Sequence, residues 1–162
     1  MASNYINTHR ALEQLGIDYI SILKKILVSD DKVATGNLVR SLRYEVIDGS
    51  NGLFLEIFAL DYLKDVDEGT KAGAKSVDSL IEPIKKWMTA RRIAPNPSFK
   101  TKNRIATNIS KKINLVGIEP TYVVKRSQEQ LLKNVANLKK LTTAAKMDIE
   151  QVINDALKNL NK

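Results

Sequence analysis

The segment Gly69-Thr70-Lys71-Ala72-Gly73-Ala74-Lys75-Ser76 comes nearest to a motif that could do chemistry, because it is spaced almost like a nucleotide-binding loop. A phosphate-binding loop requires a glycine directly before its lysine, so that backbone amides can close around the phosphates. Ala74 occupies that position, and the segment follows a predicted helical turn rather than a buried strand. We therefore interpret residues 70–79 as an exposed loop and expect no nucleotide hydrolysis.

Other side chains with chemical potential are few. The chain of 162 residues has no cysteine and one histidine, His9, which excludes disulfides, thiolate metal sites and any site that needs two imidazoles. An acidic cluster over residues 61–68 lacks the spacing of a calcium loop, so a solvated face or a contact between subunits is the better interpretation. We expect no catalytic residue, no metal site and no cofactor.

Positive charge is concentrated in the second half of the chain. The net charge is +8; residues 1–81 carry 9 basic and 12 acidic side chains, whereas residues 82–162 carry 17 and 6. Such a surface suits nucleic acid, an acidic partner or the acidic part of a neighbouring copy. The predicted basic face consists of Arg91, Arg92, Lys100, Lys102, Arg104, Lys111 and Lys112.

Hydrophobic periodicity predicts an α+β fold, in which a small antiparallel sheet built on a hairpin packs with helices. The predicted helices cover residues 4–28, 35–41, 62–68, 80–93 with Trp87 inward, and 100–116. The predicted hairpin pairs residues 42–46 with 53–60 across a turn at 48–52, and residues 121–124 form a short strand that could extend it. Pro83 is expected in the first turn of its helix.

The last segment predicts one long amphipathic helix over residues 127–159. Thirty-three residues at 1.5 Å each reach roughly 50 Å, which exceeds a small domain, so another subunit is the natural partner. We therefore divide the chain into an α+β core over 1–125 and a helical extension over 126–162. The spacing of a heptad seam selects the partner interface: Leu131, Val135, Leu138, Ala145, Ile149 and Val152.

Two short motifs and the order of the elements resemble the tail-completion, or head–tail joining, proteins of tailed bacteriophages. The first motif, residues 35–42, precedes the hairpin, and the second runs from Tyr62 through Val66-Asp67-Glu68-Gly69-Thr70 after it. Gly117-Ile118-Glu119-Pro120 is similar to the segment that introduces the closing strand of that family. The resemblance covers about residues 5–124. The family-like residues are Thr35, Gly36, Leu38, Ser41, Tyr62, Val66, Glu68, Gly69 and Thr70.

The resemblance implies a virion structural protein without catalytic activity. It would assemble in the host cytoplasm into an oligomeric ring at the neck, where it joins portal to tail and lines the DNA passage. Implied partners are further copies and the portal, connector or tail proteins, with non-specific contact to packaged DNA and no membrane. Two alternatives remain open: a sequence-neutral DNA-binding protein that uses residues 85–126, and an adaptor or chaperone that acts through its terminal helix.

Overall fold

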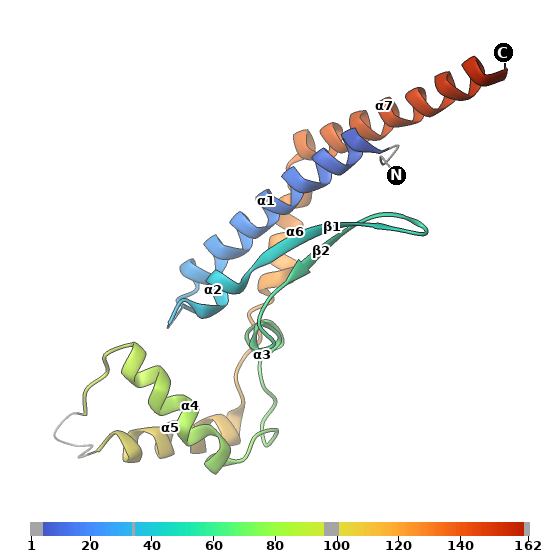
Figure 1. The fold of residues 1–162 in the computed structure, drawn as a ribbon. Helices are drawn as coiled ribbons and strands as arrows, with labels where there is room; N and C mark the ends of the chain where they lie inside the picture. Colours follow the sequence, from blue (N-terminus) through green and yellow to red (C-terminus); the bar gives the residue numbers. More distant parts are fainter. Residues whose placement is uncertain (1–4, 34, 96–100, 161–162) are drawn as a thin grey trace. The chain divides into compact units, whose positions relative to one another are not determined.

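The computed structural model describes residues 5–33, 35–95 and 101–160, and over these it forms seven helices and one two-stranded antiparallel sheet. Residue 4 and Lys100, where two helices were expected to begin, lie outside the described residues. The elements are α1 Ile6–Ser29, α2 Asn37–Ser41, β1 Arg43–Gly49, β2 Gly52–Phe58, α3 Tyr62–Glu68, α4 Val77–Ala90, α5 Lys102–Val116, α6 Val123–Lys133 and α7 Val135–Leu160 (Figure 1). The predicted α+β class with a long C-terminal helix is confirmed.

The chain divides into two compact units. Unit 1 contains Met1–Ile26, Leu42–Phe58 and Lys125–Lys162, and unit 2 contains Leu27–Ser41 and Ala59–Val124. The C-terminal segment, which we expected to extend from a core over residues 1–125, therefore shares one compact unit with α1 and the hairpin. Within the described ranges, no helix combines the length and the apolar character that a membrane span requires.

In unit 1, the predicted hairpin is confirmed, with β1 and β2 in register through pairs such as Val46 with Leu55. Inward side chains such as Tyr44 are half-buried and alternate with exposed ones, as a half-buried strand requires. A Cβ on Gly16 of α1 would lie only 2.5 Å from Cδ2 of Tyr44. The glycine therefore allows the hairpin to pack directly on the helix.

Helices α1 and α7 of unit 1 run antiparallel, and polar contacts fix their register (Figure 1). Near the middle of α1, the amide of Asn137 donates to the carboxyl of Asp18 at 2.7 Å. At the start of α1, the carboxylate of Asp148 is 1% exposed and accepts four hydrogen bonds of 2.6–3.1 Å from the backbone and side chains of Asn7 and Thr8.

Asp148 thus caps the N-terminus of α1 from another helix. The first N–H groups of a helix have no hydrogen-bond partner inside it. They lie at the positive end of the helix dipole, which attracts an anion. Burial raises the pKa of the Asp148 carboxyl, but the hydrogen bonds from Thr8 and Asn7 outweigh burial, so the pKa lies below its ordinary value of 3.8. The carboxyl is therefore ionised in the native protein at neutral pH.

The prediction of one helix over residues 127–159 is wrong, because the segment forms two helices that meet at Asn134. The N–H of Asn134 donates to the carbonyl of Leu131, and the N–H of Asn137 donates to the carbonyl of Asn134, both across three residues rather than four. Asparagine competes for the backbone through its own side chain and is a poor helix former. Heptad spacing reports only the apolar positions, so it does not detect this break.

In unit 2, α4 and α5 pack together around Leu80, Ile84, Met88 and Ala106. The structure corrects both the loop expected over residues 70–79 and the expected helix start at residue 80, because α4 begins at Val77. The Ser76 hydroxyl accepts from the N–H of Ser79 at 3.3 Å, which is the contact of a helix N-cap.

Pro83 was expected in the first turn of its helix, and this expectation is wrong because it lies in the second turn of α4. A proline there removes one backbone hydrogen bond of the helix. The carbonyl that loses its partner belongs to Ser79, four residues earlier, and Ser79 is exposed, so this carbonyl can bond to water.

Replacing Asp148 with Asn should destabilise the protein by about 1–3 kcal/mol at neutral pH, because buried N–H donors of α1 then face an amide that carries donors of its own. The pKa of Asp148 is lower in the native protein than in the unfolded chain, so the stabilisation from its ionised carboxyl is complete above the unfolded-state pKa. This stabilisation is lost as the pH falls through the native-state pKa. The stability gap between wild type and D148N should therefore narrow below about pH 4, which urea unfolding at several pH values measures.

The matched control is D155N on the same helix, because the Asp155 side chain is 61% exposed. It should change the free energy of unfolding by about 0.5 kcal/mol or less. Equal stability of the two variants at neutral pH would contradict the assigned role of Asp148.

Candidate interaction surfaces

The second family-like motif fastens two segments of unit 2 together. Thr70 and Ile118 exchange two backbone hydrogen bonds of 2.9 and 2.7 Å, and the carbonyl of Asp67 accepts two more, both of 3.0 Å, from the residues just before α6. We call residues 66–70 and 117–124, taken together, the clasp. The motif that resembles the phage family therefore acts here through its backbone.

Two glycines make the clasp sterically feasible. Gly69 and Gly117 have φ angles of 72° and 78°, in the left-handed region that favours glycine. A Cβ on Gly69 would lie 2.2 Å from the carbonyl oxygen of Ile118, and one on Gly117 would lie 2.3 Å from that of Thr70. No side chain fits at these distances, so both positions require glycine.

The strand predicted over residues 121–124 is wrong, because α6 begins at Val123 and the only sheet in the described residues has two strands. The carboxyl of Asp67 accepts from the N–H of Val124 at 2.8 Å and so caps α6. Tyr122 has a φ of 50°, which is incompatible with an extended strand. Ile118 forms an isolated bridge with Thr70 in place of the expected closing strand.

The first family-like motif also builds local structure. The Thr35 hydroxyl accepts from the N–H of Asn37 at 3.4 Å, and the Gly36 carbonyl accepts from the N–H of Arg40 at 3.0 Å. Leu38 is buried. The hydroxyl of Ser41 donates to the Leu38 carbonyl at 2.8 Å and accepts from the N–H of residue 60 at 3.2 Å. These contacts start α2 and tie its end to the segment before α3.

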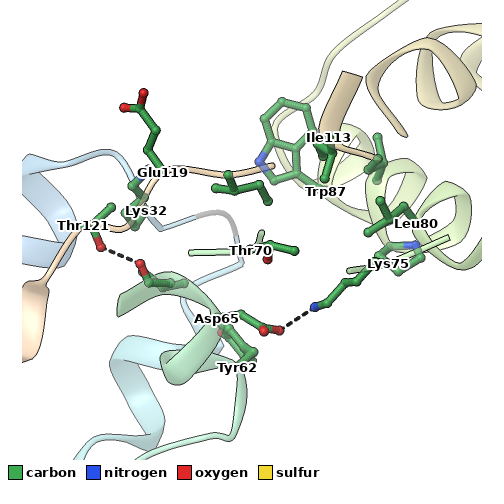
Figure 2. Close-up of a pocket in the computed structure, with 14 residues that line it drawn as sticks. Lys32, Tyr62, Asp65, Thr70, Lys75, Leu80, Trp87, Ile113, Glu119 and Thr121 are labelled. Carbon is green, nitrogen blue, oxygen red and sulfur yellow. Dashed lines mark hydrogen bonds and ion pairs between the residues drawn. The ribbon is translucent and has the colours of Figure 1, made fainter. Parts of the chain in front are cut away.

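Beside the clasp, unit 2 has an apolar groove of about 380 Å³, which we call the Trp87 groove (Figure 2). Its apolar lining comes from α3, α4, the end of α5 and the clasp. The lining residues are Tyr62, Val66, Leu80, Pro83, Ile84, Trp87, Ile113 and Ile118, with Lys32, Asp65, Thr70, Lys75, Glu119 and Thr121 as polar members.

Trp87 was expected to point inward on its helix, and this expectation is wrong because the side chain is 42% exposed. Figure 2 shows its indole beside Ile113 at the groove, with the Asp65–Lys75 pair at another edge. That ion pair measures 2.8 Å, and the Thr121 hydroxyl donates to the Val66 carbonyl at 2.5 Å. These two contacts pair some of the polar groups of the groove with other groups of the same chain. The groove therefore offers mainly its apolar surface to a ligand.

Contacts within unit 2 engage part of the predicted basic face. Arg91 is bound by Asp31, through the carboxyl and the carbonyl at 2.5 Å each, and Lys102 donates to the hydroxyl of Thr89 at 3.3 Å. Arg92 is exposed at the end of α4. The remaining exposed members are on α5: Arg104, Lys111 and Lys112.

The predicted seam residues fall into two groups. Leu131 is 8% exposed, and Leu138 and Ala145 are half-buried, so these three pack within unit 1. The other three are exposed to solvent: Val135, Ile149 and Val152. The seam is therefore divided, and only its second group is accessible to a partner.

A basic groove in unit 1 was missed by the sequence analysis. Arg10 of α1 and Lys139 and Lys140 of α7 line a groove of about 360 Å³, and none of its described lining residues is a carboxylate. The three cations are distant in sequence, and only the antiparallel packing of α1 on α7 brings them together. Counting charges along the chain could not reveal this groove.

The acidic residues of the cluster over 61–68 make separate contacts and do not share one site. Asp65 forms an ion pair with Lys75, and Asp67 caps α6. Within the part of the chain that the structure describes, no group of three or more His, Cys, Asp or Glu side chains is arranged to hold a metal ion.

Comparisons of the chain with family models, curated proteins and solved structures gave no match.

Replacing Gly69 with Ala should destabilise the protein by about 3 kcal/mol or more, because the new methyl group meets the backbone of the clasp as well as an unfavourable φ. Gly73→Ala is the matched control. Gly73 also has a positive φ, of 74°, but a Cβ there meets nothing within 4 Å. The control should therefore cost only about 1–2 kcal/mol. Thermal unfolding of both variants measures the difference, and equal losses would contradict the clasp.

Proposed function

We propose that the chain is a structural subunit of a tailed-phage virion, which assembles with copies of itself into a ring at the neck, joins portal to tail and lines the DNA passage. The two motifs over residues 35–42 and 62–70 support the neck assignment through their resemblance to head–tail joining proteins. Their contacts build turns, a helix start and the clasp, which is consistent with a structural role rather than a catalytic one.

The observation that carries the proposal is the exposed end of α7. Twelve residues of α7 follow Asp148, the residue that caps the start of α1, and they extend the helix by about 18 Å. The described side chains from residue 149 to 158 are all exposed. Four of them form an apolar stripe at helical spacing, which we call the α7 stripe: Ile149, Val152, Ile153 and Leu157. A contiguous apolar surface of this kind marks a protein–protein interface.

Replacing Val152 with Glu should weaken self-association at least about tenfold, because a charge would replace an apolar contact at the centre of the stripe. Light scattering coupled to size exclusion, and native mass spectrometry, give the oligomer mass for wild type and V152E. Q151E is the matched control, because Gln151 is exposed on the same turn but lies away from the stripe. This variant should assemble like wild type.

The portal protein encoded in the same genome should promote assembly of the wild-type chain. A chain that stays monomeric at every concentration, alone and with that portal, would contradict the proposed function. Loss of assembly in both V152E and Q151E would show that added negative charge, not the stripe, governs association.

The second candidate function is sequence-neutral DNA binding, and the groove of Arg10, Lys139 and Lys140 favours it. Three cations around one groove can neutralise phosphates of a nucleic-acid backbone, and such binding does not read sequence. The groove lies in unit 1, outside the region 85–126 that the sequence analysis selected for this role. A neck subunit that lines a DNA passage would also tolerate such a groove.

Fluorescence anisotropy with a short DNA duplex separates the two basic surfaces. The triple variant R10A/K139A/K140A should weaken binding more than R104A/K111A/K112A, although both remove three exposed charges. Binding should fall steeply with salt, and the slope of log affinity against log salt should drop by about 1 for each phosphate that the variant no longer neutralises. A larger loss of affinity in the α5 variant would instead place the DNA-binding surface in region 85–126.

A further inference from the structure

The outward face of the hairpin carries two cross-strand pairs that are unfavourable when exposed to water. Glu45 and Glu56 are exposed and stand directly opposite each other on β1 and β2. Like charges in this position destabilise a sheet. The next outward pair toward the turn is apolar, and its members, Ile47 and Phe54, are 36% and 48% exposed. A partner that supplies a cation and an apolar side chain would relieve the repulsion and cover the apolar pair.

One of the two carboxylates has a cation of its own. Arg43 forms an ion pair with Glu45 and lies over the ring of Phe58, 4.2 Å from its centre. Within the residues that the structure describes, no such ion pair forms to Glu56. The outward face of the hairpin therefore keeps one uncompensated negative charge beside its apolar pair.

Helix α5 carries the complementary groups. It contains no acidic residue, and three exposed residues share one side of it at positions i, i+3 and i+7: Asn108, Lys111 and Leu115, which we call the α5 stripe. Leu115 is 77% exposed, and no ion pair to Lys111 forms in the described ranges. Arg104, one turn before Asn108, and Lys112, on the flank of the stripe, are further exposed cations.

The spacing of charge and apolar group agrees between the two surfaces. Glu56 and Phe54 are two residues apart on a strand, which is about 7 Å. Lys111 and Leu115 are four residues apart on a helix, which is about 6 Å. When Leu115 contacts the apolar pair, Lys111 therefore reaches the carboxylates.

Other partners match this pattern less well. In the basic groove of unit 1, the exposed Met147 lies seven residues from Lys140, or about 10 Å along the helix. A nucleic-acid backbone on α5 would meet the cations but leave Leu115 uncovered. The combination of charge and apolar group thus selects the hairpin of this chain as the partner of the α5 stripe.

We propose that the outward face of the hairpin of one copy docks on the α5 stripe of the next copy, with Lys111 against Glu56 and Leu115 against the apolar pair. This inference rests on the proposed function, since it names one contact between ring subunits. The two surfaces belong to unit 1 and unit 2, and every copy carries both. A contact between different surfaces is head-to-tail, and its repetition closes into a ring when the rotation allows.

Exchange of the two charges tests the contact at constant net charge. E56K and K111E should each weaken self-association at least about tenfold, because each brings like charges together across the contact. The double variant E56K/K111E should restore the dissociation constant to within about threefold of wild type. Sedimentation velocity over a range of concentrations measures these constants, and circular dichroism checks that each variant is folded.

The matched control for the exchange is E56K/K140E. It has the same net charge as wild type, but Lys140 lies in the basic groove of unit 1 and not on α5. This variant should associate as weakly as E56K alone.

Disulfide cross-linking tests the apolar half of the contact, because the natural chain has no cysteine. The variants F54C and L115C, one of them tagged, are mixed under mild oxidation. The expected product is a disulfide between the two different chains, formed at least about tenfold faster than between F54C and M147C, because a disulfide requires the two Cα atoms to approach within about 7 Å. Met147 is exposed but lies in the basic groove.

The outcomes separate this inference from the proposed function. If oligomers form but neither the restored association nor the mixed disulfide is seen, this contact is overturned while the proposed function stands. Restoration by K140E would place the hairpin on the basic groove and overturn the inference, as would a disulfide that forms only within single chains of F54C/L115C. If K111E leaves association unchanged and weakens binding of duplex DNA, α5 binds DNA and the inference is overturned. A chain that never assembles contradicts both.

Discussion

A buried carboxylate sets the geometry of unit 1. Asp148 lies in a long helix between residues that pack, and its charge is stable there only because Asn7 and Thr8 supply hydrogen bonds. Four donors converge at one point, so α7 cannot slide along α1 by a turn without leaving both the carboxylate and the helix start unsatisfied. Apolar packing alone tolerates such slips more readily, since it is less directional than hydrogen bonding. The position of Asp148 therefore decides how much of α7 packs on α1 and how much projects.

The same device recurs in unit 2. Asp67 caps α6 from outside that helix, as Asp148 caps α1, and in both cases the capping residue is distant in sequence from the helix it caps. When a remote carboxyl caps a helix start, the capping hydrogen bond is also a tertiary contact. The helix is therefore capped only when the segments of the unit pack together. The glycines of the clasp have a similar dual role, because Gly69 permits both the turn and the approach of the second segment. A short motif can therefore require a particular residue at one position, although glycine and threonine are common at turns.

The sequence predicted what local patterns control and missed what remote contacts control. Alternation of apolar residues and the turn around Gly49 and Gly52 were sufficient for the hairpin, because register and turn are both local. The two-helix C-terminus was missed, since the break at Asn134 and the burial of Asp148 both contradict a purely apolar seam. Trp87 lies at the margin of its helix's apolar face, where periodicity does not distinguish core from groove. The strand over residues 121–124 failed because an aspartate more than fifty residues earlier caps a helix there.

These constraints bear on how the projecting end of α7 can bind a partner. An isolated segment of twelve residues would be only marginally helical in water, because nucleation of a helix is costly. Here the first half of α7 is packed and its register is fixed at Asp148, so the exposed half continues a helix that already exists. A partner then meets a preformed stripe at a defined distance from α1, and little conformational entropy is lost on docking. Weakening the Asp148 cap should therefore weaken association as well as stability, although Asp148 itself is 1% exposed and has little surface to offer a partner.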